Sequence, residues 1–232
     1  MYRSKGGPDL RRTKQDAMQT REAILDAAET LFYEQGVAGT TLSHIAASAG
    51  LTRGAIYWHF SNKLELFRAM QERAKLPQEE FFDEQACAGR RSLQDLYENT
   101  LEALRHLERD ERTRKILTIL LFRCEYVGEM QDAMLRRADA EATMHKAITG
   151  IFAAVQIRGE LKHEWQPKEA ATAYVCAVSG VISEWLRSDR GFDLTGVGAR
   201  VVRSVIAGFA CSSARVACLE EMAEARAAAN LN

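Results

Sequence analysis

The 232-residue sequence has few features of a β protein or a membrane protein. It holds only three prolines and scarcely any alternating β-type runs, whereas Ala, Leu, Glu and Arg, which favour helices, are abundant. Its longest apolar run, residues 170–182, is interrupted by polar residues and is shorter than the roughly 20 residues that cross a bilayer. The composition therefore predicts an all-α protein with no membrane partner.

The sequence also lacks the motifs of metal sites and of common enzymes. Its five cysteines are widely spaced, and no Cys-x-x-Cys or His/Cys pair has zinc spacing. It contains no nucleophile–base motif and no Gly-rich phosphate loop. We therefore expect no enzyme, with no catalytic residue, no metal and no cofactor. The N-terminus has no apolar signal segment, so we also expect reduced thiols in a cytoplasmic protein.

Charge is distributed unevenly, although the net charge is only −1. Residues 1–21 carry six basic and two acidic side chains, whereas residues 76–232 carry 20 basic and 24 acidic ones. A basic N-terminal region on an acidic body favours a contact with nucleic acid. The alternative is a solvated arm, and we assign residues 1–19 to a basic, flexible arm.

Apolar residues recur with helical spacing along most of the chain. By residue number, the expected helices are 20–35, 42–49, 53–60, 62–75, 93–109, 113–122, 130–158, 167–187 and 197–209. We expect Gly36 to end the first helix, and Thr52 and Ser61 to cap the third and the fourth. The second and third helices are joined by a three-residue turn that contains Gly50, which is the arrangement of a helix-turn-helix motif.

The stretch "GLTRGAIYWHFSNK", residues 50–63, carries an unusual set of side chains for a short helix. If Ile56 and Phe60 face the core, the residues at the outer side or its edge are Arg53, Gly54, Ala55, Tyr57, Trp58 and His59. Arg53 matches a guanine edge with two hydrogen bonds, and the methyl group of Ala55 matches that of thymine. Lys63 is expected to reach the DNA backbone. This set of side chains favours a helix that enters a DNA groove.

Two of these residues have an alternative role, and the helix starts offer a further contact. Trp58 either contacts DNA or packs partly against the fourth helix. His59 either donates to a phosphate, as we expect of Tyr57, or is a cap or surface residue. The exposed amides at the helix starts near Thr41, Thr52 and Ser61 also favour phosphate.

The segment "TREAILDAAETLFYEQGVAGTTLSHIAASAGLTRGAIYWHFSNKLELF", residues 20–67, resembles the DNA-binding domain of TetR/AcrR-family transcriptional regulators. The segments "LLFRCEYVGEM" (120–130) and "SGVISEWLRSDRGFDL" (179–194) are similar to the ligand domain of AcrR-like repressors of multidrug efflux operons. The resemblance implies a homodimer that binds a palindromic operator and is released by a small-molecule inducer.

The break near Pro77 marks the expected end of the first domain, and the resemblance implies a set of DNA contacts. The DNA-binding domain with its linking helix would span residues 20–76, the ligand-binding and dimerisation bundle 77–211, and a tail 212–232. The family's DNA contacts fall on Arg53, Gly54, Ala55, Tyr57, Trp58, His59 and Lys63, assisted by Thr41 and Ser43. The region before Lys14 is longer than in many members, and its basic residues either enter a minor groove or remain in solvent.

A bundle of amphipathic helices can hold a ligand between them. The candidate pocket residues are Leu104, Leu107, Ile116, Ile119, Leu120, Arg123, Glu125, Met134, Met144, Val178, Ile182 and Trp185. The alternative for the apolar members is an ordinary core. Glu125 is either a counter-ion for cationic inducers or the surface partner of an arginine such as Arg123.

Apolar residues on the last two long helices are candidates for a dimer interface of four helices. They are Val175, Ile182, Trp185, Leu186, Val202, Val205, Ile206 and Phe209. The competing interpretation is that they fill the core of the single chain.

These observations favour a repressor of a multidrug efflux operon that responds to a hydrophobic or cationic inducer. Within the family, the alternative is a regulator that responds to a fatty acid, a quorum signal or another metabolite. From other classes, the alternatives are a helical enzyme acting on small apolar molecules and a helical interaction module without DNA binding. Substrate turnover would favour the enzyme, and a buried Arg53–His59 segment would favour the interaction module.

Overall fold

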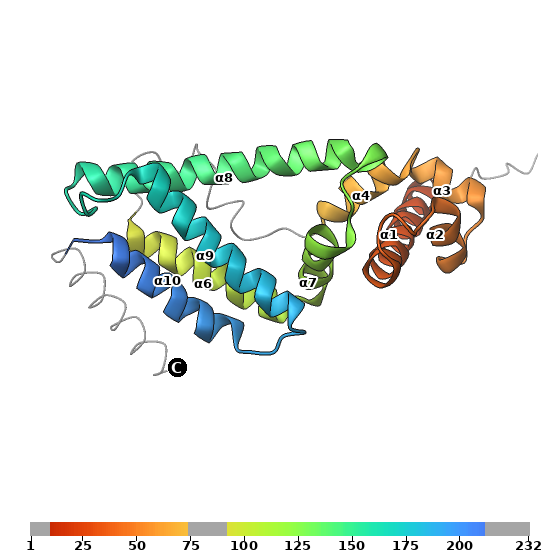
Figure 1. Cartoon of the computed structure of the whole chain (residues 1–232). Helices are drawn as coiled ribbons and strands as arrows, with labels where there is room; N and C mark the ends of the chain where they lie inside the picture. Colours follow the sequence, from red (N-terminus) through yellow and green to blue (C-terminus); the bar gives the residue numbers. More distant parts are fainter. Residues whose placement is uncertain (1–9, 74–91, 212–232) are drawn as a thin grey trace, which may run out of the picture. The chain divides into compact units, whose positions relative to one another are not determined.

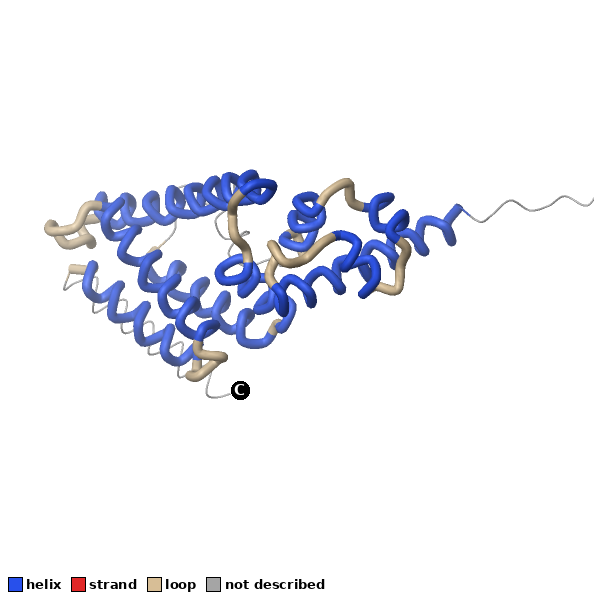
Figure 2. The backbone as a smooth tube through the Cα atoms, turned by 45° about the vertical axis from the view of Figure 1, so that its right-hand side comes forward, coloured by secondary structure: helices blue, strands red, loops and turns tan. Residues whose placement is uncertain are grey.

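The computed structural model describes residues 10–73 and 92–211, with side chains from residue 15 onward. The described part is all-α: Figure 2 shows helices and loops, and the β-type pairing consists of an isolated bridge between Leu161 and Ala210. No described helix is both long and apolar enough to cross a membrane. Of the cysteines, Cys124, Cys176 and Cys211 are not joined in a disulfide, and the other two lie outside the described residues.

The chain divides into two compact units (Figure 1). Unit 1 comprises residues 1–74 and 115–134, and unit 2 comprises residues 75–114 and 135–232. Unit 1 holds α1 (Leu10–Gln35), α2 (Leu42–Ser48), α3 (Arg53–His59), α4 (Lys63–Gln71), the π-helical turn η1 (Ile119–Arg123) and the 3-10 turn η2 (Gly128–Met130). Unit 2 holds α6 (Leu93–Arg109), α9 (Pro167–Arg187) and α10 (Leu194–Phe209), while α7 (Glu111–Thr118) and α8 (Gln131–Ile157) have residues in both.

Most of the predicted helices are confirmed within a few residues, and the exceptions have local causes. α1 begins at Leu10 rather than near Thr20, so residues 10–19 of the predicted flexible arm are helical. The apolar stripe starts only at Ile24, but the residues before it are good helix formers without Pro or Gly from position 10 on. Residues 1–9 of the arm and the tail 212–232 lie outside the described residues.

Side-chain caps define the short helices of unit 1. The hydroxyl oxygen of Thr41 accepts from the His44 amide, and that of Thr52 accepts from the Ala55 amide, both at 3.2 Å. The predicted cap Ser61 is wrong: Asn62 caps α4, because its side-chain oxygen accepts from the Glu65 amide at 2.8 Å. Ser61 instead donates its own N–H and O–H groups to the Glu65 carboxylate.

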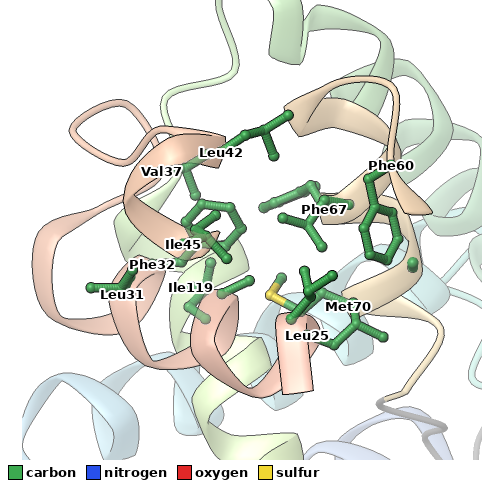
Figure 3. Close-up of a cluster of buried hydrophobic side chains, with 14 of the residues drawn as sticks. Leu25, Leu31, Phe32, Val37, Leu42, Ile45, Phe60, Phe67, Met70 and Ile119 are labelled. Atoms are coloured by element: carbon green, nitrogen blue, oxygen red, sulfur yellow. The ribbon is translucent and has the colours of Figure 1, made fainter. Parts of the chain in front are cut away.

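The core of unit 1 is built from side chains of its helices and of the later segment around η1. Figure 3 shows Phe32 of α1, Ile45 of α2 and Phe67 of α4 in one cluster with Ile119. Ile116 is also fully buried in this cluster. Residues 115–134 are therefore part of the same unit as the helix-turn-helix, although the sequence analysis had grouped them with the ligand domain.

Unit 2 is built from longer helices, and α10 packs against both α6 and α9 (Figure 1). α10 approaches α6 closely because Gly198 has no side chain: a Cβ at this position would overlap the side chain of Leu104. The carboxylate of Glu108 on α6 accepts from the amides of Leu194 and Thr195, at 2.9 and 3.3 Å, at the start of α10. Steric fit and a polar cap thus set how α10 lies on α6.

Candidate nucleic-acid interface

The helix α3 is anchored on its inner side and exposed on its outer side. Ile56 is fully buried, and Phe60, which directly follows the helix, is almost fully buried. The outer side carries Tyr57, which is 44% exposed, and Trp58, which is 73% exposed. A large aromatic side chain left in water is costly and commonly marks a binding surface. The exposure of Trp58 is what the DNA-contact alternative requires, whereas packing against α4 would cover the ring.

The polar residues of α3 extend this outer surface. Arg53 is exposed, and its guanidinium lies 5.6 Å from the centre of the Tyr57 ring, one helical turn away. Gly54 is also exposed and Ala55 is half-buried, so no bulky side chain stands between the first turn of α3 and an approaching base. An arginine beside small residues can donate two hydrogen bonds to a guanine edge.

His59 closes the surface at the end of α3. Partial burial, and then the positive charge of Arg21, hold the pKa of His59 below its ordinary value of 6.5. Its ring stands edge-on to that of Trp58, with 4.7 Å between the centres. Arg21 of α1 also lies over the ring of Phe60, 5.2 Å from its centre. Arg21 is therefore a basic group near the end of α3, whereas the sequence analysis had treated it only as part of a charged region.

Thr41, Ser43 and Thr52 are exposed at the first turns of α2 and α3. The structure thus brings Thr52 and all the predicted DNA contacts except Lys63 to the outer side or edge of one helix-turn-helix motif. Lys63 differs, because its side chain is only 14% exposed. Its ammonium contacts the main-chain oxygens of Val37 and Thr40 and the carboxylate of Glu129.

The twelve predicted pocket residues are divided between the two units. Leu104, Leu107 and Trp185 are buried in unit 2, and Met144, Val178 and Ile182 are half-buried there. The other six belong to unit 1: Ile116 and Ile119 are in its core, Leu120 packs against that core, and Arg123, Glu125 and Met134 are exposed. Helical spacing identifies an apolar side chain, but it does not identify the neighbour against which that side chain packs.

The predicted dimer residues also separate by burial. Trp185, Val202, Ile206 and Phe209 are buried within the single chain, where the indole N–H of Trp185 donates to the Phe192 oxygen at 2.9 Å. The residues that keep part of their apolar surface exposed are Val175, Ile182, Leu186 and Val205. For the buried residues the competing interpretation, a core role, is the one that the structure shows.

The described residues contain no group of three or more His, Cys, Asp or Glu side chains arranged to hold a metal ion. The site offers instead an exposed arginine, aromatic rings, small residues and helix N-termini. This combination suits contacts with phosphates and base edges.

Two family models match the chain. The model of bacterial regulatory proteins of the tetR family matches residues 24–70. The model of the C-terminal region of MAATS-type transcriptional repressors matches residues 91–210.

Similar curated proteins include the HTH-type transcriptional repressor BepR of Brucella suis biovar 1. It is 42% identical over 198 residues, which cover 85% of this chain and 95% of BepR. The HTH-type transcriptional regulator TtgR of Pseudomonas putida is 40% identical over 197 residues, or 81% of this chain and 90% of TtgR.

Among solved structures, NalD of Pseudomonas aeruginosa, the secondary repressor of the MexAB-OprM multidrug efflux pump, has a TM-score of 0.74 and 36% identity. That match covers 84% of this chain and 99% of NalD. A SmeT–triclosan complex has a TM-score of 0.72 and 31% identity, and it covers 84% of this chain and 94% of SmeT. SmeT is the repressor of the Stenotrophomonas maltophilia multidrug efflux pump SmeDEF.

Proposed function

The chain belongs to the tetR family of bacterial regulatory proteins, and from this premise we propose that it represses a multidrug efflux operon and is released by a small-molecule inducer. As a tetR-family repressor by homology it is a transcriptional regulator and not an enzyme. The efflux target is supported by the relatives NalD and SmeT, whose descriptions name multidrug pumps. A role at chromosomal DNA implies a cytoplasmic protein.

The exposed outer side of α3 is the observation that carries the DNA-binding role. α3 enters a major groove, where Arg53 donates to a guanine while Tyr57 and His59 contact phosphates. Trp58, exposed beside them, adds contact area on the same side. Because this surface would be small for one chain, two copies bind a palindromic operator with half-sites about 34 Å apart.

The homodimer uses the faces of α9 and α10 that keep apolar surface in the single chain. Val175, Ile182 and Leu186 of α9 and Val205 of α10 are half-buried and supply such a face. Two helices from each subunit that meet across a two-fold axis form a four-helix interface.

The inducer is a hydrophobic or cationic molecule bound among the helices of unit 2. The SmeT–triclosan complex supports a hydrophobic one. We expect the inducer to weaken operator binding by about 5- to 150-fold, the usual range of allosteric coupling, without separating the dimer.

A mobility-shift assay tests this function. DNA from the chain's own promoter and from any adjacent pump operon is titrated with wild type, Arg53→Ala and, as a control, Arg187→Ala, which changes an exposed arginine of unit 2. Arg53→Ala should cost about 1–3 kcal/mol and relax the preference at one base pair of each half-site, while the control binds like wild type. If wild type shifts none of these DNA fragments, the proposed repressor function is refuted.

The inducer is tested in the same assay with triclosan as a hydrophobic probe and tetraphenylphosphonium as a cationic one. Release of the DNA by either probe, with the protein still dimeric in sedimentation, is the expected result. A complex that survives saturating amounts of both would contradict the proposed inducer class.

A further inference from the structure

Arg21 lies on α1, one helical turn before Ile24, which is fully buried. Its guanidinium carbon is 5.2 Å from the centre of the Phe60 ring, and Phe60 directly follows α3. The Phe60 side chain is almost fully buried, whereas the side chain of Arg21 is 42% exposed. Arg21 therefore covers the Phe60 ring and keeps part of its own side chain in solvent beside the end of α3.

The charge of Arg21 acts on both helices that meet at this point. Partial burial, and then the charge of Arg21, lower the pKa of His59, the last residue of α3. Hydrogen bonds from Ser61 lower the pKa of Glu65 in the first turn of α4, and the charge of Arg21 contributes in the same direction. Arg21 thus lies close to the junction of α3 and α4, at the edge of the surface that we assign to DNA.

The guanidinium of Arg21 is only weakly paired within the described part of the chain. Its acidic neighbour there is Glu22, 3.9 Å away and 53% exposed. The other carboxylate oxygen of Glu22 accepts from Arg73 at 2.9 Å. Arg73, by contrast, is 11% exposed and is bonded to three carboxylates of α1, those of Glu22, Asp26 and Glu29. Arg73 is therefore a structural arginine, whereas Arg21 keeps donors for an anion from outside the chain.

We propose that Arg21 binds an operator phosphate beside the end of α3, and that Phe60 holds its guanidinium in place for this contact. The inference rests on the proposed function and adds a contact from α1 to those of α2 and α3. A planar guanidinium that stacks on an aromatic ring can still donate two hydrogen bonds to one phosphate. Because the ring restricts the side chain before DNA binds, less conformational entropy is lost on binding.

The N-terminal part of α1 has the charge that favours such a contact. Residues 10–20 of α1, which precede Arg21, include Arg11, Arg12 and Lys14 against a single acidic residue. A predominantly basic stretch of helix attracts the phosphates of DNA. The competing role, in which Arg21 only covers the Phe60 ring, does not require a positive charge, so the two roles can be separated by substitution.

The decisive experiment measures operator binding of the full-length protein over a series of salt concentrations, with a promoter fragment that wild type binds. Arg21→Met removes the charge but leaves an unbranched side chain over Phe60. Arg21→Lys keeps the charge but loses the planar pair of donors. Arg187→Met removes an exposed arginine of unit 2 and is the matched control.

We expect Arg21→Met to weaken operator binding about tenfold and to reduce the slope of log K against log salt concentration by about two, one phosphate contact for each chain of the dimer. Arg21→Lys should keep the slope and lose about two- to fivefold in affinity. Arg187→Met should match wild type in both. An unchanged slope in Arg21→Met, whatever its affinity, overturns the proposal, because Arg21 then only covers Phe60.

A second measurement identifies the phosphate. Uncharged methylphosphonate groups replace the phosphates of the fragment one at a time. At the phosphate that Arg21 contacts, the replacement should weaken binding of wild type but cause no further loss in Arg21→Met. Arg21→Lys should remain sensitive at the same position, so this variant decides the matter if Arg21→Met folds poorly. If no position depends on Arg21 in this way, the contact is refuted.

The failure of this inference can be distinguished from that of the proposed function. If wild type binds none of the promoter fragments, the repressor function is refuted. The same salt series on a random-sequence duplex at low salt then still tests Arg21, because phosphate contacts do not depend on base sequence. Equal slopes for wild type and Arg21→Met on that duplex refute the phosphate contact, and a reduced slope in Arg21→Met supports it.

Discussion

Units 1 and 2 are both helical, but different interactions hold them together. α2 and α3 of unit 1 have seven residues each, too few for a helix to be stable alone in water. They depend on the caps Thr41 and Thr52 and on a core to which residues 115–134 contribute. α9 and α10 of unit 2 have 21 and 16 residues, and they pack at close range.

This difference affects where function can be recognised. In unit 1 a short, anchored helix exposes large polar and aromatic side chains. These exposed groups do not contribute to packing of the core, so packing does not explain why they are there. In unit 2 apolar residues have the same helical spacing whether they pack in the core, contact a ligand or contact another subunit. The spacing therefore does not distinguish these three roles. Candidate contacts are therefore more specific in unit 1 than in unit 2.

The dependence of unit 1 on its distant segment predicts the largest effect. Ile119→Ala should lower the free energy of unfolding by about 2–5 kcal/mol, because Ile119 is fully buried and its truncation opens a cavity in the core of unit 1. Urea denaturation followed by circular dichroism measures the loss. Phe122→Ala, in the same turn but exposed, is the control and should cost much less. Equal losses would mean that residues 115–134 are not part of the unit 1 core.

The close packing of unit 2 predicts a somewhat smaller effect. Gly198→Ala should destabilise by about 1–3 kcal/mol, because its methyl group would overlap the buried side chain of Leu104 on α6 and force it to move. Gly208→Ala, on the same helix with open space around the new methyl group, should instead stabilise by about 0.5–1 kcal/mol. Thermal denaturation of the two variants compares them directly. Two shifts of the same sign would contradict the close approach of α10 to α6.

The polar cap of unit 2 is expected to contribute less. Glu108→Gln weakens the acceptor for two amides and for the Thr195 hydroxyl at the start of α10, and we expect a loss of about 1–2 kcal/mol. Glu102→Gln, which removes only an exposed pair with Arg105, should change stability by no more than about 0.5 kcal/mol. The denaturation midpoints of the two variants are compared. Equal midpoints would contradict the role of Glu108 as a cap of α10.

The smallest expected effect is a dependence of unit 1 on pH. Since the folded chain holds the pKa of His59 below 6.5, the unfolded chain takes up this proton first as the pH falls. The contribution of His59 is therefore fully present above pH 6.5 and is lost as the pH falls through its folded pKa. Thermal unfolding of wild type and His59→Gln at several pH values between neutral and mildly acidic measures the difference.

The direction can be checked on the imidazole itself. An NMR titration of His59 should give a pKa below 6.5, and Arg21→Ala should move that pKa upward because a nearby positive charge is removed. A wild-type pKa at or above 6.5 would contradict the burial and charge found at this residue.

Much of unit 1 could be predicted because its signals are local. Gly36 and Gly50, both with positive φ, end α1 and α2, and Thr41 and Thr52 begin the helices that follow. The outer side of α3 follows once Ile56 is assigned to the core. In unit 2, α9 spans residues 167–187 as predicted, because Pro167 suits a first helical turn.

The structure alone decided what depends on residues far apart in the chain. It assigned Ile119 to the core of the DNA-binding unit and placed Glu129 beside Lys63. The sequence by itself determined most of the helices, the caps Thr41 and Thr52 and the exposed outer side of α3, because hydrogen bonds and apolar stripes within a few residues specify them. Packing determined the partner of each inward side chain, because helical spacing shows which face is buried but not which surface covers it.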